Sequence, residues 1–229
     1  MTAIKQQSKR ADRARETRRR IAAAARELFV EQGYGATSLQ EVAERAGVAV
    51  QTIYFVFGNK RTLLKEVVDT TIAGDDEPIP VMHRPWFLEA LDATRAEDQL
   101  RRHVHGTRQI LDRVAPITKV VETAIATDPE VAALWPHGGD SRSTPLSPLT
   151  TWPPRYLGHL TAAQALVTKP GARAGVTAER AADLLYGLLS PALYLIFVRD
   201  RAWSPEEWED WMYETLCSQL CATWRPWIR

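Results

Sequence analysis

The strongest constraint on the fold is the spacing of apolar residues and glycines over the first 70 or so positions. Apolar side chains fall at helical spacing from Ile21 to Phe29, and Gly33 and Gly35 follow them. Three further short segments show the same spacing, and each ends at a glycine or begins just after one. The pattern therefore predicts four helices packed into this part of the chain.

The second and third of these segments are joined by a tight turn. The sequence TSLQE, from Thr37 to Glu41, offers a helix-starting capping box in two registers, with either Thr37 or Ser38 as the N-cap residue. The helix that it opens ends at Gly47, and another begins a few residues later and runs to about Phe57. Two short helices joined by a glycine-containing turn have the layout of a helix-turn-helix.

The rest of the chain also follows helical spacing, and we find no alternating pattern long enough to predict a strand. We expect helices at residues 86–113, 117–135, 158–168, 177–198 and 204–224, with irregular segments at 73–85 and 136–154. Pro191 should kink the fourth of these helices. We predict an all-α protein with a basic, disordered arm at 1–13, a helix-turn-helix domain at 14–72 and a second helical domain at 73–229.

The charge of the chain is divided unevenly. Residues 1–71 carry 13 Lys and Arg against 8 Asp and Glu, whereas the remainder carries 16 against 20. We call the basic residues 1–71 the head and the acidic remainder the body. This division of charge indicates that the head alone binds a polyanion. No uninterrupted apolar run approaches the roughly 18 residues of a membrane span. We therefore expect a cytoplasmic protein without membrane contact.

The ordered set of residues in the head resembles the DNA-binding domain of the TetR/AcrR transcriptional regulators. The marks are Leu28-Phe29, Gly33-Tyr34, Thr37, Ala43, Gly47-Val48, Thr52-Ile53-Tyr54, Phe57 and Lys60. The stretch AADLLYGLLSPALYLIFVRDRAWSPEEWEDWMYETL is similar to the last two helices of actinobacterial-type members, so the resemblance covers over half of the chain. It implies a three-helix head, a fourth linking helix, and a body that binds a ligand and dimerises. The chain departs from the family at Phe55-Val56-Phe57 and at residues 136–154.

One side of the third segment suits the major groove of DNA. Gln51 can pair with adenine, and Val50 could touch a thymine methyl group. Tyr54 and Phe55 should face the groove wall, although each is also readable as a surface aromatic, and Gln51 as a solvated side chain. By resemblance, Tyr54, Lys60 and the hydroxyl of Thr37 or Ser38 contact phosphate. The predicted DNA contacts are Thr37, Ser38, Ala49, Val50, Gln51, Thr52, Tyr54, Phe55, Lys60, Arg15 and Arg18.

Arg15 and Arg18 belong to a basic run that begins at Lys9 and ends at Arg20. Basic arms add salt-dependent affinity by meeting phosphates or the minor groove. The alternative is that the run forms a solvated helix face.

The last two helices are apolar around most of their surface, so we expect a partner to cover them. The predicted homodimer interface is a four-helix contact across a two-fold axis. The alternative is an intramolecular core. The interface residues are Leu184, Leu185, Leu188, Leu189, Leu193, Trp208, Trp211, Met212, Leu216 and Leu220.

Nine residues of the body are candidates for the lining of a ligand cavity, and each is also readable as ordinary core. They are Trp86, Phe87, His103, Ile110, Val121, Trp135, Tyr156, Tyr186 and Tyr194. The expected effector is an apolar or aromatic small molecule.

Neither metal nor cofactor chemistry is indicated by the sequence. Cys217 and Cys221, four residues apart, are most simply small buried hydrophobes, with a redox or metal role as the weaker alternative. His103 and His105 are two residues apart and cannot share a helical face. We expect no metal site and no cofactor.

The chain also lacks a nucleophile elbow, a phosphate-binding loop and zinc-ligand spacing. His137 and Asp140, in HGGD, form the nearest polar cluster, and loop chemistry explains it equally well. We therefore expect no enzymatic activity.

By resemblance, the chain is a ligand-responsive regulator that a small molecule releases from a palindromic operator. Ligand in the body would move the fourth helix, residues 60–71, and change the spacing of the two recognition helices. The alternative is an effector-independent DNA-binding or activating protein of the same fold.

The assignment of base reading to Gln51 predicts that Gln51→Ala relaxes sequence preference. A bidentate Gln–adenine pair contributes about 1–3 kcal/mol of discrimination, so related operators should become nearly equivalent. The measurement is the relative affinity for operators that differ at single positions. Unchanged discrimination in Gln51→Ala would remove the assignment.

Overall fold

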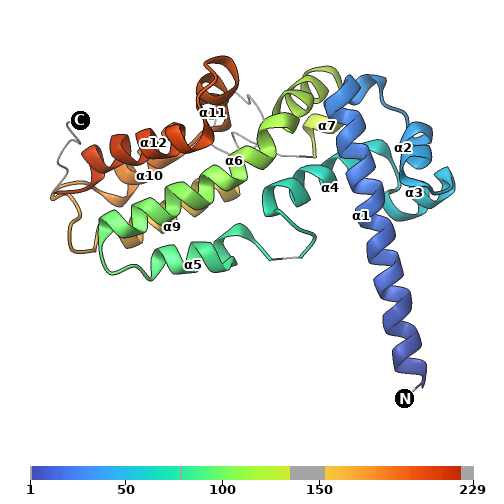
Figure 1. Cartoon of the computed structure of the whole chain (residues 1–229), viewed down its shortest axis with the longest axis horizontal. Helices are drawn as coiled ribbons and strands as arrows, with labels where there is room; N and C mark the ends of the chain where they lie inside the picture. The colour runs from blue at the N-terminus through green and yellow to red at the C-terminus, as the bar shows by residue number, and fades with distance from the viewer. Residues whose placement is uncertain (1, 78, 135–152, 223–229) are drawn as a thin grey trace. The chain divides into compact units, whose positions relative to one another are not determined.

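The computed structural model describes residues 2–77, 79–134 and 153–222, and over these ranges its regular elements are helical (Figure 1). One isolated bridge pairs Ala172 with Cys221. The α-helices are α1 (Thr2–Ala36), α2 (Leu39–Ala46), α3 (Val50–Phe57), α4 (Lys60–Ala73), α5 (Pro85–Leu91), α6 (Ala96–Thr127), α7 (Pro129–Ala132), α9 (Pro153–Leu166), α10 (Ala178–Leu188), α11 (Pro191–Leu195) and α12 (Pro205–Leu220). A 3-10 turn, η1 (Val81–His83), precedes α5, and a π-helical segment, η2 (Ile196–Asp200), follows α11.

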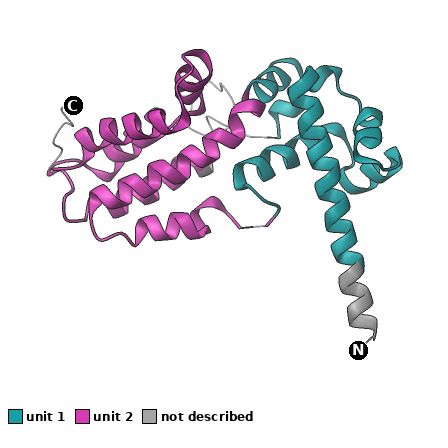
Figure 2. Ribbon diagram, in the orientation of Figure 1, with its two compact units in different colours: residues 1–76, 119–136 teal, residues 77–118, 137–229 magenta. Residues whose placement is uncertain are grey.

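The chain divides into two compact units (Figure 2). The first contains residues 1–76 and 119–136, and the second contains residues 77–118 and 137–229. The division falls inside α6, whose last turns therefore belong to the first unit.

The first unit is built on α1, which packs against α2 and α4. Its core consists of side chains that the apolar spacing placed inward, including Ile21, Phe29, Val42 and Leu64, all at 0% exposure. Gly33 has a φ of 86°, a left-handed value that favours glycine, and it interrupts the helical geometry of α1. Consequently Tyr34 turns back onto Phe29, with their ring centroids 5.6 Å apart.

The N-terminal segment is helical in the structure, in contrast to the disorder that we expected for residues 1–13. Helix α1 begins at Thr2 and runs without a break into the core-forming stretch. The segment contains no Pro or Gly, and its Ala, Lys, Arg and Gln residues are strong helix formers. A helix already nucleated by packing further along the chain extends through such a segment at little cost.

The second unit arranges α5, α6, α9, α10 and α12 around one core, and α9 and α10 pack closely together. Figure 1 shows α6, α9, α10 and α12 running alongside one another in this unit. The expected break near Pro116 is absent, because α6 continues through that residue. Pro116 is exposed, so its missing N–H is the main local loss. The helix expected from residue 86 instead ends at Leu91.

Ala178–Asp200 is long and apolar enough to cross a membrane by length and composition, with a mean hydropathy of 1.7. In the structure it is not one straight helix. Ser190 caps a new helix, α11, at Pro191, as the kink expected there implied. Leu185 and Leu189 are buried in the core, so the segment serves a folded helical unit.

The predicted dimer interface requires a correction. Six of its ten residues are buried within the chain itself, with exposures of 0% or 1%: Leu185, Leu189, Trp208, Met212, Leu216 and Leu220. The apolar stripe on α12 is therefore core: α10 packs against this helix, and the Tyr194 ring of α11 packs on Trp208. Only Leu184, Leu188, Leu193 and Trp211 of the predicted set retain partly exposed surface.

Candidate nucleic-acid interface

The turn between α2 and α3 is fixed at both ends. Ser38 is the N-cap residue of α2, and its hydroxyl accepts from the Glu41 N–H (3.2 Å) while the Glu41 carboxylate accepts from the Ser38 N–H (2.8 Å). Gly47 ends α2 in the left-handed conformation (φ 64°, ψ 44°). This conformation is energetically unfavourable for residues that have a Cβ atom. The guanidinium of Arg20 donates to the carbonyls of Ala46 (2.5 Å) and Gly47 (3.1 Å). These contacts set the direction in which α3 begins.

Helix α3 presents one side to the core and another to solvent. Ile53 and Phe57 are buried, at 0% and 4% exposure, as their spacing predicted. Gln51 is exposed, Tyr54 is 55% exposed and Phe55 is 90% exposed. A short helix with a buried face and polar and aromatic residues outside can enter the major groove of DNA.

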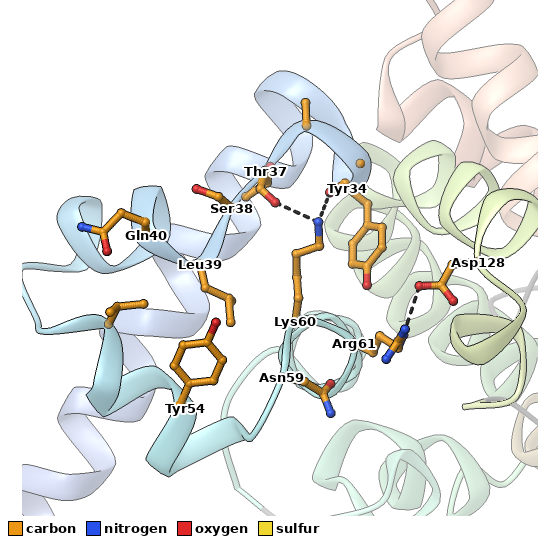
Figure 3. A pocket seen from close by; sticks show the side chains of 13 residues that line it. Tyr34, Thr37, Ser38, Leu39, Gln40, Tyr54, Asn59, Lys60, Arg61 and Asp128 are labelled. Carbon is orange, nitrogen blue, oxygen red and sulfur yellow. Dashed lines mark hydrogen bonds and ion pairs between the residues drawn. The ribbon is translucent and has the colours of Figure 1, made fainter.

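A groove of about 820 Å³ lies beside α3 (Figure 3). Its walls come from the end of α1, the starts of α2 and α4, and α3. Two helix N-termini open on it, because its lining includes the N-cap residues Ser38 of α2 and Asn59 of α4. N-terminal N–H groups attract anions, and the Tyr54 hydroxyl on the same groove can donate a hydrogen bond. The lining thus combines groups that could donate to a phosphate with one carboxylate, that of Asp128.

Lys60 lines this groove, but its ammonium already has partners. It donates to the carbonyls of Tyr34 and Thr37, both at 2.8 Å, and lies 4.3 Å from the centre of the Tyr34 ring. Burial lowers the pKa of Lys60, although Asp128 and Glu41 oppose the shift. The structure thus gives Lys60 a positioning role between α4 and the α1–α2 connection, in place of the exposed phosphate contact that we expected.

Thr37 also differs from the prediction. Its side chain is 1% exposed, and its hydroxyl donates to the Gly33 carbonyl at 2.8 Å. It is therefore unavailable to DNA, and of the two hydroxyls that we considered, Ser38 is the exposed one.

The predicted arginines lie in ion pairs of the first unit. Arg18 makes two hydrogen bonds to the Glu66 carboxylate, at 2.7 and 2.8 Å, and its guanidinium is 4.8 Å from the centre of the Phe57 ring. Arg15 pairs with Asp76 at 2.7 Å. Both side chains remain more than 40% exposed, so a phosphate would compete with an existing carboxylate at each position.

The remaining predicted contacts lie at the start of α3. Ala49 is its exposed N-cap residue and makes no side-chain cap bond. Val50 is half-buried on the groove, and Thr52 is half-buried. Small side chains here let the helix approach a duplex closely.

The comparisons with known proteins agree with this geometry. The family model for bacterial regulatory proteins of the tetR family matches residues 21–67. The HTH-type transcriptional regulator YvkB of Bacillus subtilis (strain 168) is 43% identical over 54 residues, which cover 24% of this chain and 29% of YvkB. The chain spans between 29% and 54% of the length of the curated relatives that it matches.

Solved structures extend the similarity of fold to most of the chain. A putative TetR-family transcriptional regulator from Mesorhizobium loti superposes with a TM-score of 0.64 at 20% identity, covering 92% of this chain and 99% of that one. NalD, the secondary repressor of the MexAB-OprM multidrug efflux pump in Pseudomonas aeruginosa, has a TM-score of 0.55 at 20% identity, covering 93% and 100%. The class of protein is an all-α chain with an N-terminal helix-turn-helix and a helical body. Over residues 21–67 the chain is similar to the bacterial regulatory proteins of the tetR family.

Five of the nine predicted ligand residues come together in the second unit, and His159 joins them. Ring contacts run from Trp86 and Phe87 on α5 through His103 on α6 and His159 on α9 to Tyr186 on α10 and Tyr156 on α9, with centroids 5.3–6.3 Å apart. We call this set the ring cluster. The sequence signal for His159 was a histidine in the small, apolar run GHLTAAQAL.

The other predicted ligand residues lie elsewhere. The Tyr194 hydroxyl donates to Asp112, and its ring packs on Trp208 at 4.9 Å. Val121 is buried in the first unit and makes none of these ring contacts. Ile110 is half-buried and makes none of these ring contacts, and Trp135 lies outside the described residues, as do His137 and Asp140.

The ring cluster is polar at its centre. The imidazoles of His103 and His159 meet at 3.1 Å between Nε2 and Nδ1. Burial lowers the pKa of His103 to about 4 and that of His159 well below its usual value. Within the described part of the chain, Nδ1 of His103 and Oε1 of Gln99, one turn away on α6, have no hydrogen-bond partner. Each such buried group costs about 1–3 kcal/mol.

Metal binding finds no support among the described residues, which contain no group of three or more His, Cys, Asp or Glu placed to hold an ion. Cys217 and Cys221 are both buried and form no disulfide with each other.

The position of Lys60 predicts a loss of stability in Lys60→Ala. The variant removes two hydrogen bonds from a charged donor and leaves two carbonyls without that partner, so unfolding in urea should show a loss of about 1–3 kcal/mol. Lys119→Ala, at an exposed site, removes the same charge and should change stability by less than about 0.5 kcal/mol. If both variants are equally stable and Lys60→Ala instead flattens the salt dependence of DNA binding by about one unit, the phosphate role expected from the sequence is the correct one.

The buried imidazole pair predicts a stability that falls with pH below about 6.5. Both pKa values are depressed in the folded state, so the unfolded chain binds more protons and stability is lost as pH decreases. Between pH 6.5 and 5 each imidazole should contribute up to about 1.4 kcal/mol per pH unit to the free energy of unfolding. His159→Leu should reduce this slope by the contribution of about one proton. His83→Gln, at an exposed position, should leave the slope unchanged. A slope that is the same in all three proteins would contradict the assignment.

Proposed function

We propose that the chain is a transcriptional repressor that binds a palindromic DNA operator as a homodimer and leaves it when a small molecule binds. The observation that carries the DNA-binding part is the arrangement of α3. Its exposed Gln51 and Phe55 stand beside a groove into which two capped helix N-termini open. NalD, which shares the fold and is a repressor, supports the direction of the effect.

A homodimer follows from the small size of one head. A single recognition helix contacts few base pairs, and regulators with this motif reach useful affinity by reading two half-sites. The surface that we assign to the partner contains the partly exposed members of the predicted set, Leu184, Leu188, Leu193 and Trp211. Ile196, 49% exposed, lies close in sequence to this set.

The effector site that we assign is the ring cluster. It offers aromatic faces for an apolar or aromatic molecule, and Nδ1 of His103 and Oε1 of Gln99 could take hydrogen bonds from it. His103 and Gln99 lie on α6, the helix whose last turns belong to the first unit. A ligand that favours one conformation of α6 needs about 1–3 kcal/mol of coupling to change operator occupancy roughly 5- to 150-fold.

A structural route from α6 to the head exists inside the first unit. Asp128 directly follows α6 and pairs with Arg61 in the first turn of α4 at 3.0 Å, and Glu130 pairs with the same guanidinium at 2.6 Å. Movement at the end of α6 would therefore act on α4, which directly follows the recognition helix α3. The protein would work in the cytoplasm, where its DNA is.

The test combines selection of DNA with a ligand screen. Duplexes enriched from a random pool should contain an inverted repeat, and some aromatic compounds should both raise the melting temperature and release that duplex. In His103→Phe the same compounds should lose both effects while operator binding persists. Glu214→Ala, at an exposed position of α12, which contributes no residue to the ring cluster, serves as the control that keeps both.

Each negative outcome has a separate meaning. No enriched duplex would contradict DNA binding itself. An enriched duplex that no stabilising compound releases would favour an effector-independent regulator or an activator of the same fold.

A further inference from the structure

The side of α3 that lies farthest from the core is defined by two residues. Successive residues of an α-helix are rotated by about 100°, so Phe55 lies about 180° from the midpoint of the buried pair Ile53 and Phe57. Gln51, four residues earlier, lies within about 40° of Phe55 on the same outer side. The 90% exposure of Phe55 agrees with this position. Gln51 and Phe55 thus form the outer ridge of the helix.

The neighbouring side of α3 is a different surface. Val50 and Tyr54 line the groove together with Ser38 and Asn59, and neither Gln51 nor Phe55 is among the residues that line it (Figure 3). If phosphates occupy the groove, the flank with Tyr54 faces the DNA backbone. The outer ridge then points between the backbones, towards the base edges.

Phe55 restricts what those base edges can be. Its ring has no hydrogen-bond donor or acceptor, and among the described residues no ring or cation contact is found for it. In the major groove the apolar group that a base pair presents is the C5 methyl of thymine. A phenyl ring in contact with the polar edge of a G·C pair would leave base groups without hydrogen bonds.

We propose that Phe55 reads the C5 methyl group of a thymine in the operator half-site, beside the adenine that Gln51 binds. The proposal rests on the proposed DNA-binding function. Residues four apart are separated by about 6 Å along the helix, and base pairs by about 3.4 Å, so the two contacts fall within about two base pairs. The sequence analysis suggested Val50 for the contact with a thymine methyl group. Because Val50 is half-buried on the groove, we assign this contact to Phe55 instead.

The experiment removes the methyl group without changing the pairing. In a duplex selected with the wild-type chain, each thymine is replaced in turn by uracil, and affinity is measured by fluorescence anisotropy. One replacement in each half-site should weaken wild-type binding about fourfold, the value expected for one buried methyl-sized group. Phe55→Ala removes both contacts of the proposed homodimer, so it should bind the thymine duplex about sixteenfold more weakly and should not distinguish it from the uracil duplex.

Two variants serve as controls. Phe55→Leu keeps an apolar side chain and should retain part of the preference for thymine. Val30→Ala truncates another exposed apolar side chain of the first unit, 41% exposed on α1, and should bind and discriminate as the wild type does. Urea unfolding should show equal stability for Phe55→Ala and the wild type, because the ring is exposed.

The outcomes separate this proposal from the function on which it rests. A thymine preference that survives in Phe55→Ala, or an enriched duplex with no uracil-sensitive position, would overturn the reading by Phe55 and leave DNA binding intact. Failure to enrich any duplex would overturn both.

Discussion

The structure of the head depends on the burial of Ile53 and Phe57 against its core. These two side chains decide which side of α3 faces inward, and the opposite side is thereby committed to solvent. The left-handed Gly47 and the Arg20 guanidinium on two carbonyls fix where that helix starts. Every inference about DNA recognition follows from this orientation, because the residues proposed to meet bases or phosphates are placed by it.

Cations in this head act largely on the protein itself. Arg20 caps the end of α2, Lys60 holds the α1–α2 connection, and Arg18 links α1 to Glu66 on α4. The basic composition of the first 71 residues therefore overstates the positive charge that is available to a duplex. Phosphate affinity would rest to a greater extent on helix N-termini and on hydroxyl groups such as that of Tyr54.

The sequence predicted the local structure of the head well, for a physical reason. Caps, glycine stops and apolar periodicity act over a few residues, so the helices from Ile21 to Ala73 were visible in the pattern. Ser38 was one of the two capping-box registers that the pattern offered, and the structure adopts it. Contacts between distant segments were not. The partners of Lys60 lie 26 and 23 residues away.

The same limit explains the body. Periodicity showed that α10 and α12 have apolar sides but not which neighbour covers them, and Trp208 and Leu216 are covered within the chain. The ring cluster was anticipated in part, since aromatic and histidine residues of separate helices do meet. His159 was missed, because its role depends on a histidine 56 residues away. The tetR family model matches residues 21–67, which lie in the head, and gives no information about the body.

The central claim is that the outer side of α3, together with the groove beside it, is the surface that meets DNA. Amide hydrogen exchange, measured by mass spectrometry with and without a selected duplex, tests it directly. The account predicts slower exchange in peptides that cover residues 37–60 when the duplex is bound. Unchanged exchange in these peptides, with protection confined to the second unit, would contradict it.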